Sequence, residues 1–101
     1  MKYFAVFLPM LSPEKSQEYR PQHLDYLAIR RKEGKIFANG RFLDGAGGLV
    51  IYKADSEEEV RHIVQQDPYV IHQARGYEIH EWVNGNGGDS SRIVKASRKV
   101  L

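Results

Sequence analysis

His23 and Asp67 are the residues of this chain whose types best suit acid–base chemistry. An ordinary imidazole titrates at about pH 6.5, so it can carry a proton near neutrality. His23 lies just before Leu24, at the edge of the buried stripe of a predicted helix, where a side chain can reach a cleft while the helix stays packed. A carboxylate such as Asp67 serves this chemistry when it fixes the tautomer of a histidine and stabilises its protonated form.

Both residues also have an ordinary structural interpretation. A histidine at the boundary of a helix face can simply hydrogen-bond a backbone carbonyl. Asp67 precedes Pro68, which is typical of a helix N-cap followed by proline at the first helical position. The remaining histidines lack metal-ligand spacing with any carboxylate and the chain has no cysteine, so we expect neither a metal site nor a thiolate nucleophile.

The composition predicts one globular domain with a charged tail. The chain has 101 residues, of which 42% are hydrophobic and 28% charged, and its lack of cysteine fits a cytoplasmic protein. No apolar run approaches the roughly 20 residues of a membrane span, and residues 1–11 are interpreted as a strand, not a signal peptide.

Residues 84–91 have the composition of a flexible linker. The last 18 residues carry a net charge of +3, which leaves −1 on the first 83 and disfavours nucleic acid as a partner of the body.

The pattern of apolar residues predicts an α+β, ferredoxin-like sandwich with an antiparallel sheet. Strands are expected at 2–8, 35–42, 48–54 and 76–83, and helices at 21–32 and from the Ser56 cap to Asp67-Pro68. The order strand, helix, strand, strand, helix, strand is the βαββαβ arrangement. A loop is expected around Ser12 to Ser16, an irregular turn of helix at 69–75, and a left-handed helix cap at Gly34. Gly40, inside a strand pattern, indicates a bulge or the close approach of a ligand or of backbone.

The predicted sheet has more apolar surface than one layer of helices can cover. The first strand is apolar on both faces, with Phe4, Val6 and Leu8 on one side and Tyr3, Ala5 and Phe7 on the other. A large exposed apolar face is a liability unless another surface covers it. The simplest cover is a second copy, sheet against sheet, so we expect a homodimer or a higher oligomer.

The order and spacing of several short motifs resemble the YciI-like family over residues 1–83. The motifs are Arg20-Pro-Gln-His23-Leu-Asp-Tyr-Leu27, Gly34, Gly40, Gly48-Leu-Val-Ile51, Asp67-Pro-Tyr69 and Gly76-Tyr-Glu-Ile79. The resemblance implies a dimeric α+β barrel with a cleft in each subunit, in which His23 and Asp67 form a pair. It also implies a role for Arg20, which matches an arginine that commonly precedes the histidine. Relatives of the family include a chloromuconolactone dehalogenase, and muconolactone isomerases share the barrel architecture.

One departure from the family concerns the end of the second strand. Many members have proline after the glycine there, whereas this chain has Arg41 after Gly40. The extra cation favours an anionic ligand near the mouth of the cleft, or it simply points to solvent. We expect Arg20, Gly40, Arg41 and Tyr69 to contact the ligand, with Arg20 as a carboxylate anchor.

The leading hypothesis is a cytoplasmic homodimer that binds a small organic anion and moves a proton on it. His23 would be the general base or acid and Asp67 its orienting partner, in a cofactor-independent isomerase or lyase of the lactone-isomerase or dehydrohalogenase type. The alternative is a non-catalytic accessory or sensor domain whose cleft binds a metabolite. A third interpretation makes the basic tail an arm that contacts nucleic acid or protein.

Overall fold

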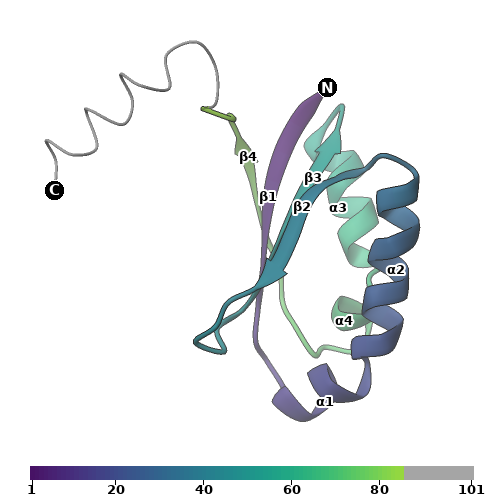
Figure 1. Cartoon of the computed structure of the whole chain (residues 1–101), viewed down its shortest axis with the longest axis vertical. Helices are drawn as coiled ribbons and strands as arrows, with labels where there is room; N and C mark the ends of the chain where they lie inside the picture. The colour runs from purple at the N-terminus through teal and green to yellow at the C-terminus, as the bar shows by residue number, and fades with distance from the viewer. Residues whose placement is uncertain (86–101) are drawn as a thin grey trace, which may run out of the picture.

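One antiparallel sheet of four strands organises the computed structural model of the chain, which describes residues 1–85 (Figure 1). In sheet order the strands are β2 (Ile36–Arg41), β3 (Gly47–Ala54), β1 (Lys2–Pro9) and β4 (Glu78–Trp82). The central strands are β3 and β1, which pair along their full length from Lys2 opposite Ala54 to Pro9 opposite Gly47.

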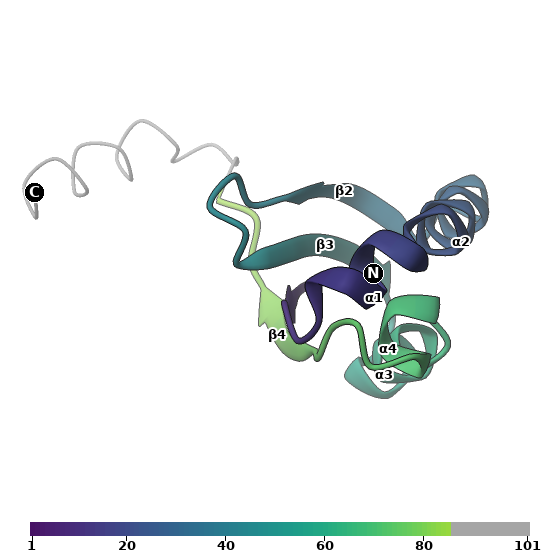
Figure 2. The ribbon, with the colours of Figure 1, turned by 90° about the horizontal axis from the view of Figure 1, so that it is seen from below.

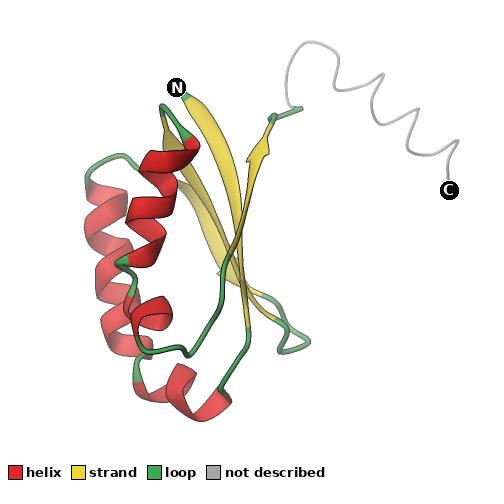
Figure 3. Cartoon of the chain, turned by 180° about the vertical axis from the view of Figure 1, so that it is seen from behind, coloured by secondary structure: helices red, strands yellow, loops and turns green. Residues whose placement is uncertain are grey.

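Four helices lie on one side of this sheet, as Figures 2 and 3 show. They are α1 (Pro13–Glu18), α2 (Arg20–Lys32), α3 (Glu57–Gln65) and α4 (Pro68–Ile71). With α2 after β1 and α3 after β3, the order is the ferredoxin-like βαββαβ, so the predicted α+β sandwich is confirmed. The short α4 occupies the segment that was expected to be an irregular turn of helix.

The loop expected around Ser12 to Ser16 was wrong, because this segment forms α1. The Ser12 side chain accepts a hydrogen bond from the backbone N–H of Lys15, and Pro13 occupies the first helical turn. These are the ordinary signals of a helix start, a serine cap followed by proline. The result is that Ser16 sits on a helix and is buried.

The hydrophobic core lies between the helices and one face of the sheet. Phe4, Val6 and Leu8 of β1 are buried, while the alternate residues of that strand are only half-buried. The rest of the core is Leu27, Ile36, Val50, Tyr52, Ala54, Val60 and Val64. Tyr26 of α2 also donates a hydrogen bond of 2.7 Å to the Ile63 carbonyl, which joins the two long helices.

No helix within residues 1–85 covers the opposite face of the sheet (Figure 3), and apolar side chains lie on that face. Tyr3 packs edge-on against Phe37 at 5.2 Å and against Trp82 at 6.0 Å between ring centroids. Phe37 remains 47% exposed, and Phe42 beside Phe7 is also exposed. The apolar open face expected from the sequence is therefore present.

Gly34 and Gly40 were each predicted to have a special backbone role, and only Gly34 has the predicted conformation. Gly34 ends α2 with a φ of +78°, as predicted for a left-handed cap. Gly40 is not a bulge: it pairs in register with Leu49, and the irregularity of β2 lies earlier, between Ile36 and Ala38. The space on the side where Gly40 lacks a side chain is open, since a Cβ built there would meet nothing within 4 Å.

The predicted linker and basic tail, residues 84–101, lie outside the described residues except for the first two positions. Within residues 1–85, no helix is long and apolar enough to cross a membrane.

Gly47 provides a test of the pairing between β1 and β3. Its φ is +141°, and an added Cβ would lie 2.1 Å from the Leu8 carbonyl oxygen, whereas Gly45 has a φ of +82° with open space around it. We expect Gly47→Ala to lower the free energy of unfolding by about 3 kcal/mol or more, because strain and a backbone clash add. Gly45→Ala should cost only about 1–2 kcal/mol, from backbone strain alone. Urea unfolding of both variants checks this, and equal losses would contradict the register.

Candidate functional site

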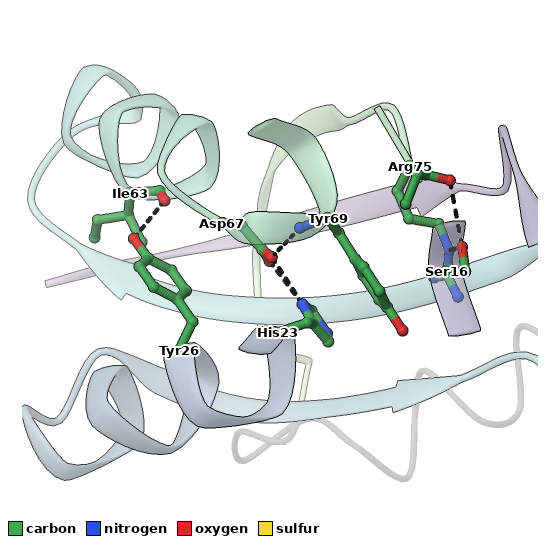
Figure 4. A network of polar contacts seen from close by, with 8 residues as sticks. Ser16, His23, Tyr26, Ile63, Asp67, Tyr69 and Arg75 are labelled. Carbon is green, nitrogen blue, oxygen red and sulfur yellow. Dashed lines mark hydrogen bonds and ion pairs between the residues drawn. The ribbon is translucent and has the colours of Figure 1, made fainter. Parts of the chain in front are cut away.

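His23 and Asp67 form a buried hydrogen-bonded pair between α2 and the start of α4 (Figure 4). The Nδ1 atom of His23 lies 2.8 Å from Oδ1 and 3.0 Å from Oδ2 of Asp67. Asp67 is 1% exposed and His23 is 7% exposed. The two residues that the sequence singled out for acid–base chemistry are thus in direct contact.

Asp67 serves two hydrogen-bond donors at once. Its Oδ1 atom also accepts the backbone N–H of Tyr69 at 3.0 Å, so it caps α4 as the structural interpretation predicted. An ionised carboxylate can only accept hydrogen bonds, so the proton between the two side chains belongs to His23 Nδ1. In the neutral ring, the lone pair is then on Nε2, on the side of the ring away from Asp67.

Local sequence fixes both residues in place. Pro68 disfavours helical backbone at the residue before it, and Asp67 accordingly has an extended conformation that separates α3 from α4. On the other side, α2 begins at Arg20-Pro21, and the His23 N–H donates to the Tyr19 carbonyl at 3.0 Å. His23 is thereby held in the first turns of a helix that packs on the core through Leu27.

Tyr69 separates His23 from a second functional side chain, Arg75 (Figure 4). Its ring stacks on the His23 ring with centroids 3.9 Å apart, and the Arg75 guanidinium carbon lies 4.5 Å from the same ring centroid. Burial raises the pKa of the Tyr69 phenol, while the positive charges of Arg75 and Arg20 oppose that rise. The phenol is therefore protonated at neutral pH and available as a hydrogen-bond donor.

Arg75 and Ser16 are site residues that the sequence analysis missed. Arg75 is 9% exposed, and its Nε donates a hydrogen bond of 3.0 Å to Ser16 Oγ. Burial lowers the pKa of Arg75, yet an arginine remains charged at neutral pH. The contact joins residues 59 positions apart, and neither belongs to a recognisable motif, so no pattern in the sequence pointed to it.

A pocket of about 480 Å³ opens in front of these side chains, between the helices and the β2–β3 edge of the sheet. Its lining comprises Leu8, Ser16, Gln17, Arg20, His23, Leu24, Leu27, Asn39, Gly40, Arg41, Gly48, Leu49, Val50, Tyr69 and Arg75. The four predicted ligand contacts, Arg20, Gly40, Arg41 and Tyr69, all belong to this set, and Asp67 lies behind His23. The volume suits a small organic molecule.

The lining of the pocket is strongly biased in charge. It contains three arginines and a histidine but, among the described residues, no aspartate or glutamate. Arg20 and Arg41 are exposed, whereas Arg75 is buried. Within residues 1–85 no three His, Asp or Glu side chains gather as they would to hold a metal ion.

Comparisons with known proteins agree with this architecture. The family model described as YCII-related domain matches residues 2–83. The uncharacterized protein YjpA of Bacillus subtilis (strain 168) is 31% identical over 80 residues, covering 79% of this chain and 94% of its own length. At the level of structure the chain is similar to TftG, the 5-chloro-2-hydroxyhydroquinone dehydrochlorinase of Burkholderia phenoliruptrix AC1100, solved in complex with 2,5-dihydroxybenzoquinone. The TM-score is 0.66 with 22% identity, over 82% of this chain and 95% of TftG, a likeness of fold.

A double-mutant cycle tests whether His23 and Asp67 act as one buried unit. We expect His23→Gln and Asp67→Asn each to lower the free energy of unfolding by about 1–3 kcal/mol, because each leaves a buried polar partner poorly satisfied. The double variant should lose less than the sum of the two, by about 1 kcal/mol or more. Asp25→Asn, an exposed change on the same helix, is the matched control. Additive losses in urea unfolding would mean that the two side chains are not coupled.

Proposed function

The chain belongs to the YCII-related domain family, and we propose that it is a cytoplasmic homodimer whose pocket binds a small organic anion on which His23 moves a proton. One observation carries the proposal: the ring of His23, oriented by Asp67, lines a pocket that holds three arginines and, among the described residues, no acid. A negatively charged ligand compensates the positive charge of this lining, and an oriented imidazole beside that ligand can act as a base.

The proposed chemistry begins with removal of a proton next to a carbonyl group. Nε2 of His23 takes the proton, and Asp67 stabilises the imidazolium that forms. The electron pair of the broken bond moves toward the carbonyl oxygen, and the phenol of Tyr69, which lines the pocket, would donate a hydrogen bond to the developing charge.

Two outcomes of this step need no electron acceptor. In an isomerisation, His23 returns the proton to a different carbon of the same molecule. In a dehydrohalogenation, a halide leaves with the bonding electron pair and the products are the unsaturated molecule and HX. Elimination of HCl is the reaction that the name of TftG describes, and the shared fold supports testing it on this chain.

The catalytic proposal is tested with two probes: muconolactone, and 5-chloro-2-hydroxyhydroquinone, which would react as its keto tautomer with the chlorine on the carbon next to the carbonyl. Chloride release and deuterium uptake from D₂O, followed by NMR, report the two outcomes. We expect turnover by the wild type and a loss of about 10²- to 10⁴-fold in His23→Gln, with a smaller loss in Asp67→Asn. His62→Gln, an exposed change on α3, should keep the wild-type rate.

Two results would contradict acid–base catalysis. One is an unchanged rate in His23→Gln. The other is a wild type that binds these probes without turning them over while His23→Gln only weakens binding. The second result would favour the non-catalytic sensor interpretation.

The homodimer is proposed from the uncovered face of the sheet. The exposed ring of Phe37, with Tyr3 and Trp82 beside it, and that of Phe42, with Phe7 beside it, form an apolar surface that a second copy would bury.

Light scattering after size exclusion tests the dimer. We expect a mass of twice 11.6 kDa for the wild type. Trp82→Glu should give the single-chain mass, because it would bury a charge without a partner in the interface. Ile29→Glu places the same charge on an exposed apolar site of α2, and this control should remain dimeric. A wild type of single-chain mass would refute the dimer.

A further inference from the structure

Arg75 is a buried cation without an acidic partner among the described residues. Its contacts are the Tyr69 ring and the hydroxyl of Ser16, both neutral. The more exposed cations Arg30, Lys35 and Arg61 each pair with a glutamate instead. A buried charge is costly unless an opposite charge or several hydrogen bonds compensate it. Asp67 acts on Arg75 through its negative charge, but its oxygens bind His23 and the N–H of Tyr69, so they do not take up the guanidinium donors.

The guanidinium is held so that its free donors lie at the pocket. Nε is used by Ser16, and the flat face of the group rests on Tyr69, which leaves the two terminal nitrogens without an acceptor among residues 1–85. Arg75 lines the pocket. Gly48 borders the guanidinium, because a Cβ at that position would lie 3.4 Å from Nη1 of Arg75 and 3.1 Å from the Gly40 carbonyl oxygen.

We propose that Arg75 is the anion-binding residue of the pocket and that it selects ligands carrying a carboxylate. A carboxylate accepts two parallel hydrogen bonds from one guanidinium, which is the geometry that two free terminal nitrogens offer. His23 and Arg75 lie on either side of the Tyr69 ring (Figure 4), so a ligand bound by Arg75 extends across Tyr69 toward His23. The proposal rests on the proposed function in taking the ligand to be an anion.

The two other arginines of the pocket differ from Arg75 in exposure. Arg20 and Arg41 are exposed, and interactions of exposed charges are weakened by water and salt. They attract an anion and speed its arrival, whereas the desolvated Arg75 contributes most of the equilibrium affinity. The expectation that Arg20 is the carboxylate anchor is the competing assignment, and the variants below distinguish the two.

Benzoate and benzamide form a matched pair of probes for this site, since they share size and shape and differ in charge. Titrations followed by NMR on the full chain give both affinities. We expect the wild type to bind benzoate more tightly than benzamide, and Arg75→Met to weaken benzoate binding by about tenfold to a hundredfold. Arg75→Lys should recover part of that loss, because it restores the charge without the paired donors.

Matched variants separate this role from general loss of charge. Arg61→Met removes a partly exposed arginine on α3 that does not line the pocket, and it should leave both affinities unchanged. Arg20→Met and Arg41→Met should weaken benzoate binding by less than about threefold and make it less dependent on salt.

A direct signal keeps the test decisive if Arg75→Met fails to fold. In the wild type, benzoate should shift the Nε–H resonance of Arg75 more than that of any other arginine. The proposal is overturned if that resonance does not respond, if benzamide binds as well as benzoate, or if folded Arg75→Met keeps the wild-type affinity. Benzoate binding that survives in His23→Gln while turnover is absent from the wild type would refute the catalytic proposal alone and leave Arg75 as the anchor.

Discussion

The hydrogen bonds between His23 and Asp67 are the interaction on which this site depends. They join α2 to the turn between α3 and α4, and the same carboxylate caps α4 through the N–H of Tyr69. Asp67 therefore positions both the His23 ring and the Tyr69 ring beside it. Because ring orientation and helix capping share one buried carboxylate, a change at this position affects folding and chemistry together.

The pocket in front of this pair has positively charged side chains both at its exposed rim and in its buried interior. Arg20 and Arg41 are exposed, while Arg75 is buried behind the Tyr69 ring. Charges at the rim act mainly on the arrival of a ligand, and a desolvated charge acts on its affinity. A small carboxylate that meets both would lie across Tyr69, next to an imidazole that is already oriented. The proposed recognition of an anion and the proposed movement of a proton would therefore take place in one pocket.

The sequence predicted the parts of this arrangement that are encoded locally. The apolar run of the first strand predicts β1, and the Asp67-Pro68 pair predicts a helix cap. The glycine after the second helix predicts where α2 ends, and its φ in the structure is positive. The resemblance of short motifs supplied the partner of His23. Contacts between distant segments were beyond such patterns: Arg75 and Ser16 meet only through tertiary packing. Of the alternatives that Gly40 suggested, the bulge is wrong, whereas the close approach of a ligand stays a prediction because Gly40 lines the pocket.

The central claim is that Asp67 orients His23 as a base, and the tautomer of His23 tests it most directly. The tautomer is read from the ring ¹⁵N chemical shifts in a long-range ¹H–¹⁵N spectrum, recorded at a pH where the His23 ring is neutral. The pair with Asp67 predicts a ring protonated on Nδ1, with Nε2 free to accept a proton. Exposed His62 in the same spectrum gives the reference for a ring without such a partner. A neutral His23 that carries its proton on Nε2 would contradict the account, because that nitrogen could then not act as the base.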